Sequence, residues 1–275
     1  MKIAICKIVI GLAVGLLSAN AIAEDSWNAA PVCEGFGPQA PRDIDSAYGK
    51  NKRIVSLAPS ASQMNLCNMH FHINAEHKAK DFAIFAGPDK GYQCSMSKHL
   101  SPAELKPTKE AICKGIDGEL KPGDTIEVHW VHTSCDVTPG AGLGSCVSAK
   151  CLNPQLRVES QVFTLVNDRL ALNFNNIDYD GNMLNGYHQA KSLPVNTGKP
   201  VEFNGSTTGE FHNDQTCSPL HVTWGVRPQC AKLDINTVGD WCKSNEFSES
   251  HAHGVRKLVT NPSLLSKIRK GDYDD

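Results

Sequence analysis

The stretch Cys67-Asn68-Met69-His70-Phe71-His72-Ile73-Asn74-Ala75-Glu76-His77 decides the fold expected of this chain. At its centre His70 and His72 stand two positions apart, with apolar Phe71 between them. Side chains two apart on a β-strand share a face, so both imidazoles would project together, about 6–7 Å apart at their bases. On a helix the same spacing separates them by about 200° around the axis, and they could not share an ion. The stretch therefore predicts a strand that carries two metal ligands on one face.

A second strand-like segment follows a proline-glycine turn and supplies a candidate third ligand. It reads Thr125-Ile126-Glu127-Val128-His129-Trp130-Val131-His132. On a strand, Glu127, His129 and Val131 share one face. If the two strands pair, His129 completes a set of three histidines. A catalytic zinc site keeps such a set and leaves its fourth position open for water.

A polar residue stands two positions before a proposed ligand in each segment: Asn68 before His70, and Glu127 before His129. Metal-bound histidines usually donate their other ring N–H to such a group, which fixes the tautomer. One His-x-His alone is more typical of a half-exposed strand, but the two segments together favour a metal site. We expect one Zn²⁺ per chain, although imidazole ligands also accept Co²⁺.

The beginning of the chain has the pattern of a signal peptide. A basic start is followed by an apolar run over residues 8–17 and by the cleavage signal Ala21-Ile22-Ala23. The run is shorter than the roughly 20 residues that a bilayer span needs. We therefore expect residues 1–23 to be removed and residues 24–275 to be periplasmic or secreted, without a membrane anchor. An uncleaved segment would instead tether the protein to the membrane.

The remaining 252 of the 275 residues suffice for a single domain with its own core. Two lysines leave with the signal peptide, so 25 basic and 29 acidic side chains remain, a net charge of −4. No basic patch of the kind that binds nucleic acid is present. These features favour a small solute as the partner, and they leave the oligomeric state open.

Ten cysteines remain after cleavage, and no Cys-x-x-Cys pair occurs among them. An even, high count in an exported chain indicates disulfides rather than metal ligands. We expect four or five bridges, with a connectivity that the sequence does not reveal.

The rest of the chain is rich in short strand patterns and poor in helical ones. Strand patterns occupy residues 53–57, 65–73, 81–85, 125–132, 156–166, 200–203 and 220–226, and a helical pattern occupies 263–270. The sequence therefore predicts a β-dominated domain, a mainly antiparallel twisted sheet with few short helices.

These motifs resemble those of carbonic anhydrases, most closely the δ class and its bacterial relatives, with a metal-site pattern like that of the α class. The resemblance rests on five segments in the family's order: Gln39 to Asp45, Asn68 to His72, Glu76-His77, Glu127 to His132, and Thr216 to Trp224. It covers most of the chain after the signal peptide. It implies an α-carbonic-anhydrase-like fold, with the metal on a central strand pair.

The resemblance also implies roles for particular side chains. Thr216 matches the threonine that orients the attacking hydroxide, and Glu76 matches the glutamate that accepts the hydrogen bond of the threonine hydroxyl. Val131 and Trp224 match walls of the CO₂ pocket. Val222 is expected to support these walls, and Gln215 stands where the α class usually has leucine, so the pocket wall is expected to be polar there.

The family's proton-transfer histidine precedes the His-x-His pair, but residues 24–69 contain no histidine. The sequence does not choose a substitute among the other histidines. His251 and His253 stand in a polar segment near the end of the chain, where we expect surface groups or adventitious metal binders.

The function implied is an exported zinc enzyme that hydrates CO₂ reversibly to bicarbonate and a proton, by attack of zinc-bound hydroxide. A zinc-dependent esterase and a catalytically silent relative that binds a ligand are the alternatives. A narrow apolar pocket would separate the two enzymes, because it admits CO₂ and restricts bulky esters.

Overall fold

The structure is a computed structural model that describes residues 33, 35–116, 118–209, 211–213 and 215–269. The described residues belong to one compact unit. The predicted signal peptide, residues 1–23, lies outside them. No described helix is long and apolar enough to cross a bilayer.

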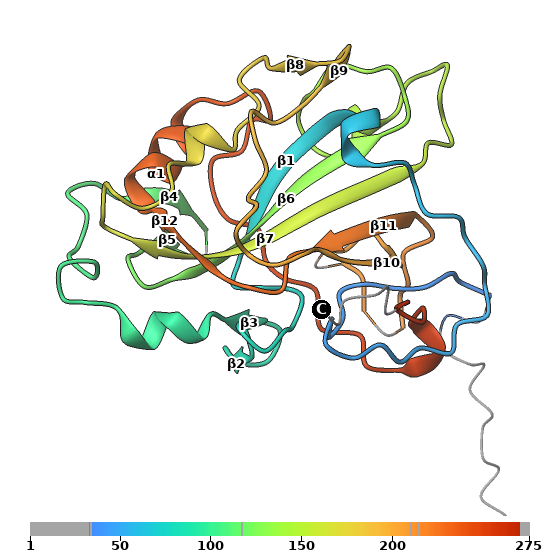
Figure 1. Ribbon diagram of the computed structural model, residues 1–275, viewed down its shortest axis with the longest axis horizontal. Coiled ribbons are helices and arrows are strands. Elements are labelled where there is room, and N and C mark those ends of the chain that lie inside the picture. Colours follow the sequence, from blue (N-terminus) through green and yellow to red (C-terminus); the bar gives the residue numbers. More distant parts are fainter. Residues whose placement is uncertain (1–32, 34, 117, 210, 214, 270–275) are drawn as a thin grey trace, which may run out of the picture. The chain divides into compact units, whose positions relative to one another are not determined.

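The main element is a six-stranded sheet in the order β1-β6-β7-β11-β10, with β12 also paired to β7. Its strands are β1 (Asn65–Ile73), β6 (Thr125–Thr133), β7 (Leu156–Val166), β10 (Val201–Ser206), β11 (His221–Val226) and β12 (Ala231–Asp234). The pairs β1–β6, β6–β7 and β10–β11 are antiparallel, whereas β11 and β12 pair with β7 in parallel. Figure 1 shows the long strands β1, β6 and β7 lying side by side with a strong twist. The predicted β-dominated, mainly antiparallel fold is confirmed, with two parallel pairings that the sequence did not indicate.

Smaller elements surround this sheet. Three two-stranded hairpins are β2 (Ile84–Phe85) with β3 (Tyr92–Gln93), β4 (Ile112–Gly115) with β5 (Gly118–Leu120), and β8 (Met183–Leu184) with β9 (Tyr187–His188). The helices are α1 (Ile235–Lys243) and the short 3₁₀ turns η1 (Ala61–Gln63), η2 (Ser95–His99), η3 (Leu143–Cys146), η4 (Phe174–Asn176) and η5 (Pro262–Leu264).

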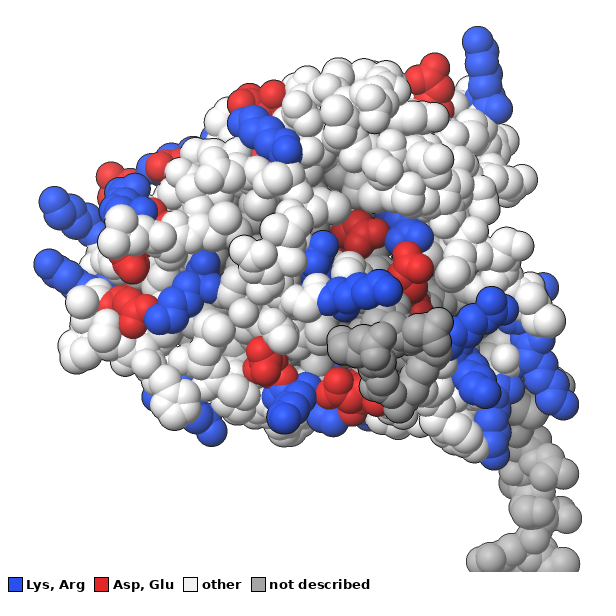
Figure 2. All heavy atoms as spheres, viewed as in Figure 1, with Lys and Arg blue, Asp and Glu red and all other residues white. Residues whose placement is uncertain are grey.

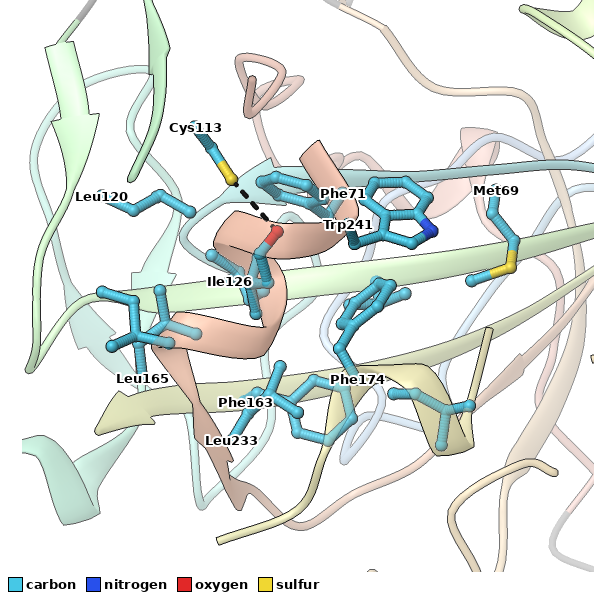
Figure 3. Close-up of a cluster of buried hydrophobic side chains, with 14 of the residues drawn as sticks. Met69, Phe71, Cys113, Leu120, Ile126, Phe163, Leu165, Phe174, Leu233 and Trp241 are labelled. Carbon is cyan, nitrogen blue, oxygen red and sulfur yellow. Dashed lines mark hydrogen bonds between the residues drawn. The ribbon is translucent and has the colours of Figure 1, made fainter. Parts of the chain in front are cut away.

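One face of β1 and β6 is apolar and forms the main core. Met69 and Phe71 of β1 and Ile126 of β6 belong to a single buried cluster. Trp241 of α1 and Phe174 of η4 cover them, with ring centroids 4.8 Å apart (Figure 3). Because successive strand residues alternate faces, this packing turns the intervening polar residues of both strands to the other side.

Two sequence expectations differ from the structure. Residues 53–57 form no strand: Ile54 is 97% exposed, and the segment is held by a side-chain contact, Asn204 Nδ2 donating to Val55 O. Within the predicted helix over 263–270, the described residues form only the end of η5 and irregular chain. A strand or helix also needs hydrogen-bond partners for its backbone N–H and C=O groups, and a pattern of apolar residues does not show whether those partners exist.

Five disulfides pair all ten cysteines from Cys33 onward, the upper of the two numbers expected. The pairs are Cys33–Cys217, Cys67–Cys146, Cys94–Cys230, Cys113–Cys242 and Cys135–Cys151. Four of them join residues 79 or more positions apart. Bridges that close long loops restrict the unfolded chain strongly, so this network is expected to stabilise the fold.

Candidate metal centre and cavity

The pairing of β1 with β6 brings three histidines to one point. His70 lies directly opposite His129, and His72 lies opposite Glu127. One ring nitrogen from each of His70, His72 and His129 lies within 4.8 Å of the others. His70 Nε2 and His129 Nδ1 are 3.3 Å apart. Tetrahedral coordination at the 2.0–2.1 Å typical of zinc–imidazole bonds places neighbouring nitrogens about 3.3–3.4 Å apart, so the spacing suits such an ion.

Each outer ring nitrogen of the triad faces an acceptor. His70 Nδ1 lies 2.7 Å from Asn68 Oδ1, and His72 Nδ1 lies 2.7 Å from Gly254 O. His129 Nε2 lies 3.2 Å from Glu127 Oε1, although outside strict hydrogen-bond geometry. A neutral imidazole carries one N–H, and these acceptors place it on the outer nitrogen. The inner nitrogens therefore present lone pairs toward one another, the arrangement that a cation requires.

Burial keeps the three rings neutral. It lowers the pKa of His72 to about 4 and lowers the pKa of His129. Burial, together with the neighbouring histidines, lowers the pKa of His70 well below its usual value. Neutral imidazoles are the form that binds metals, so near neutral pH no proton has to be displaced from the ligand nitrogens.

A second cluster, His77, Glu127 and His129, also has metal-ligating atoms close together. Its carboxylate is already occupied, because Glu127 accepts from the backbone N–H groups of Glu76 and His77, from the His77 ring and from the Ser160 hydroxyl. Burial would raise the pKa of Glu127, but His77 and His129 lower it well below its usual value. The geometry thus favours an anionic Glu127 that orients His129 rather than a second ion site.

Glu76 is fully buried beside the triad. Its Oε1 accepts from the backbone N–H of Arg256 at 2.8 Å and lies 3.6 Å from His72 Nδ1. Its Oε2 is buried without a hydrogen bond of ordinary geometry, yet the Thr208 hydroxyl lies near enough to lower the carboxyl pKa, which burial raises. A buried acceptor of this kind needs a donor, and Thr208 is the one at hand.

The triad opens into a cavity of about 360 Å³. Val131, Val222 and Trp224 line it, as expected, together with Leu156 and Val158. Polar groups line it too: Asn68, Thr207, Thr208, Glu249, His251 and His253. The site is therefore a cavity with apolar and polar walls rather than a narrow apolar slot.

Two predicted site residues, Thr216 and Gln215, lie outside this lining, and both are exposed. Asn213 Oδ1 accepts from the backbone N–H groups of both residues and closes a turn. The next residue, Cys217, is bridged to Cys33 and packs in a separate small cluster with Val259 and two leucines. These contacts hold Thr216 away from the triad, in spite of its place in the family motif.

The sequence reasoning missed Thr208, and it expected His251 and His253 to be surface groups or adventitious metal binders; His251 is exposed and His253 half-buried, but both also line the cavity. Thr208 belongs to a threonine pair directly after β10, where a strand that lines a cavity ends, and this was the available signal. The histidines gave a signal in their His-x-His spacing, which repeats that of the first strand. Only the tertiary structure places these two histidines beside the cavity, because the backbone of His253 pairs with β1. The His253 N–H donates to Phe71 O, and the His253 C=O accepts from Ile73 N.

Comparison with known proteins places the chain in a family. Residues 61–237 match the family model described as delta carbonic anhydrase. No curated protein sequence matches the chain. Three solved structures are similar at 15–16% identity and TM-scores of 0.28–0.30. The first is a hyperthermostable carbonic anhydrase from an active hydrothermal vent chimney, with 15% identity over 84% of this chain and 86% of that chain and a TM-score of 0.29. The second is the α-carbonic anhydrase of Thermovibrio ammonificans in complex with the inhibitor sulfanilamide, with 16% identity over 81% of this chain and 84% of that chain and a TM-score of 0.30. The third is the α-carbonic anhydrase of Photobacterium profundum, with 15% identity over 86% of this chain and 89% of that chain and a TM-score of 0.28. The family is shown by the match to the family model, which spans most of the chain, and not by these distant structures. The protein belongs to the delta carbonic anhydrase family and is a carbonic anhydrase.

Proposed function

We propose that this carbonic anhydrase hydrates CO₂ reversibly with one zinc ion held by His70, His72 and His129. The observation that carries the proposal is the set of three inner ring nitrogens with converging lone pairs. Among them His72 Nε2 is buried without a hydrogen-bond partner. When bound, the ion would act as a Lewis acid that lowers the pKa of a water to about 7. Co²⁺ is a second metal that imidazole ligands suit.

Thr208 and Glu76 take the orienting role that the sequence assigned to Thr216 and Glu76. If the Thr208 hydroxyl donates to Glu76 Oε2, its oxygen is left as an acceptor toward the cavity. A hydroxyl fixed in this way would accept a hydrogen bond from the attacking water and so turn the water's lone pair toward the CO₂ carbon. Arg256 N–H supports the arrangement by holding the other carboxylate oxygen.

The apolar wall suits an uncharged substrate. Trp224 packs 5.1 Å from the His129 ring, and its indole N–H donates to Ser206 O, which leaves the ring face apolar. Val131 and Val222 complete the wall, each 2% exposed. CO₂ gains little from polar contacts, so a dry apolar surface beside the triad would favour its capture over that of water.

Export and a single domain over residues 24–275 complete the proposal. Five disulfides are typical of an oxidising compartment such as the periplasm or the extracellular space. Basic and acidic side chains are interspersed over the centre of the face seen in Figure 2, which suits a small solute better than nucleic acid.

The test is stopped-flow CO₂ hydration by the oxidised protein, first as isolated, then after removal of the metal, and finally after addition of one equivalent of Zn²⁺ or Co²⁺. We expect the rate to fall to the uncatalysed level without metal and to return with zinc. Hydrolysis of a small and a bulky ester, measured on the same samples, tests the esterase alternative.

A folded, zinc-loaded protein with no CO₂ hydration would contradict the proposal and leave a silent ligand-binding relative. Ester hydrolysis that exceeds CO₂ hydration would instead identify an esterase. Full CO₂ hydration in the metal-free sample would show that the triad binds no essential ion.

A further inference from the structure

Each hydration of CO₂ releases one proton, and that proton has to reach solvent before the next turnover. The triad is a poor place from which to lose it, because His72 and His129 are only 3% and 1% exposed. Histidine is the side chain that best takes and gives protons near neutral pH. The inference below rests on the proposed function and asks which histidine carries the proton out.

The cavity limits the choice. All eleven histidines of the chain lie among the described residues, and only five of them line the cavity: His70, His72, His129, His251 and His253. Three of these form the triad. The candidates are therefore His251 and His253, the pair that the sequence placed on the surface.

His253 is held in place. Its Nε2 lies 2.7 Å from Glu249 Oε2, and its backbone bonds to both sides of His72 on β1. Its ring stands 5.5 Å from that of His70. These contacts make His253 a fixed part of the cavity wall, beside the triad.

His251 lies one step further out. Its ring stacks on that of His253, with centroids 5.9 Å apart and an interplanar angle of 28°. The residue is exposed and lines the cavity, and it also lines a smaller pocket of about 60 Å³ behind it. The His251 side chain therefore faces the cavity and is also exposed to solvent.

A glycine makes room for this side chain. A Cβ placed on Gly115 of β4 would lie 2.9 Å from both Cβ and Cδ2 of His251, closer than side chains normally approach. Gly115 has no positive φ, so the position does not require glycine for its backbone. Its lack of a side chain lets the imidazole settle against the β4–β5 hairpin.

We propose that His251 is the proton-transfer residue of this enzyme, with His253 and Gly115 as positioning residues. The proton released at the triad crosses water in the cavity to the His251 imidazole, which then gives it to buffer; no electrons are exchanged. The charged and titratable groups that line the cavity and the smaller pocket around this ring are His253, Glu249 and Glu119.

The test compares His251→Ala with the control His99→Ala, which removes an exposed histidine outside the cavity lining. Hydration is measured over a range of buffer concentrations. Oxygen-18 exchange between CO₂ and water separates CO₂–bicarbonate interconversion from the proton-dependent release of labelled water.

We expect His251→Ala to lower kcat at least about tenfold in dilute buffer, and added imidazole to restore it. The interconversion rate should change less than twofold, and His99→Ala should behave as wild type. Gly115→Ala keeps the imidazole but displaces it, so it should produce a smaller loss of the same kind.

A wild-type kcat for His251→Ala in dilute buffer would overturn the inference. So would a loss that neither imidazole nor concentrated buffer repairs, because that would indicate a structural role. Failure of the proposed function has a different signature, since the zinc-loaded wild type itself would then show no interconversion.

Discussion

The strand pair β1–β6 and the two loops beside the cavity hold their polar side chains in different ways. On the strands, His70 and His129 lie opposite each other in a ladder that pairs residues 68–73 with 126–131 without a break, and the opposite faces of both strands are buried in the core. The loops, described over residues 207–209, 211–213, 215–216 and 249–254, are held instead by separate contacts, such as the His253 ring against Glu249 and the His253 backbone against β1. Two of their exposed residues, Phe211 and His251, line the cavity.

The difference separates two tasks. Metal ligands must be held within a few tenths of an ångström, and paired strands with a packed face provide that rigidity. Orientation of water and passage of protons depend on groups that reach solvent, and loops supply these. Changes on the strands should therefore remove the metal, whereas changes in the loops should alter the rate and leave the metal bound.

The largest effect is expected from His129→Ala. Loss of one of three ligands should abolish both stoichiometric zinc binding and CO₂ hydration, measured by metal analysis after dialysis and by stopped flow. The matched control is His132→Gln on the same strand but on the opposite face, which should keep its zinc. A His129→Ala protein with one zinc per chain would show that another residue is the third ligand.

A smaller effect is expected in the loop. Thr208→Ala should keep the zinc but lower kcat/KM roughly a hundredfold, because the orienting hydroxyl is lost. Thr216→Ala should change the rate less than twofold, since this side chain is exposed and outside the cavity. A larger loss of kcat/KM for Thr216→Ala than for Thr208→Ala would show that Thr216 orients the attacking water. It would also imply that the turn at Asn213 rearranges in solution.

The smallest effect on activity is expected from His132→Gln. His132 lies on the face of β6 that packs in the core, so this substitution is expected to change the pH dependence of protein stability instead. Burial lowers the pKa of His132 to about 4, while its Nδ1 donates to Trp130 O. An unfolded histidine titrates near 6.5, so between about pH 6.5 and 4 the unfolded state binds more protons. The free energy of unfolding should therefore decrease by roughly 3 kcal/mol, on account of His132 alone, as the pH is lowered from about 6.5 to 4.

His132→Gln should remove that share of the pH dependence and leave activity at neutral pH nearly unchanged. Urea unfolding of metal-free, disulfide-intact protein at pH 4.5 and 7 would measure it. The same pH dependence in variant and wild type would mean that His132 titrates normally in the folded state.

The strand residues could be predicted because alternation of faces is a local rule. His70, His72, Glu127 and His129 stand at positions whose neighbours are apolar, and only one register buries those neighbours. The same logic predicted a mainly antiparallel sheet, but not its parallel contacts. Those contacts join β7 to β11 and β12, far apart in the chain, and a strand pattern does not specify its partner.

The loop residues could not be predicted in the same way. Thr216 occupies the motif position, yet a side-chain turn at Asn213 and the Cys33–Cys217 bridge direct it outward. His251 is exposed, as the sequence indicates, but only the pairing of His253 with β1 places its segment at the cavity. The Cys33–Cys217 bridge and the pairing of His253 with β1 have no local signature, because each joins residues that are distant in sequence.

The sequence by itself determined the strand pair, the three histidines on its polar face, the wall residues Val131 and Trp224, and a cysteine set suited to disulfides. The tertiary structure alone decided which threonine meets Glu76, which histidine stands at the cavity mouth and which cysteines pair. The physical reason is that strand periodicity acts over two residues, whereas loops take their positions from long-range bridges, buried hydrogen bonds and packing.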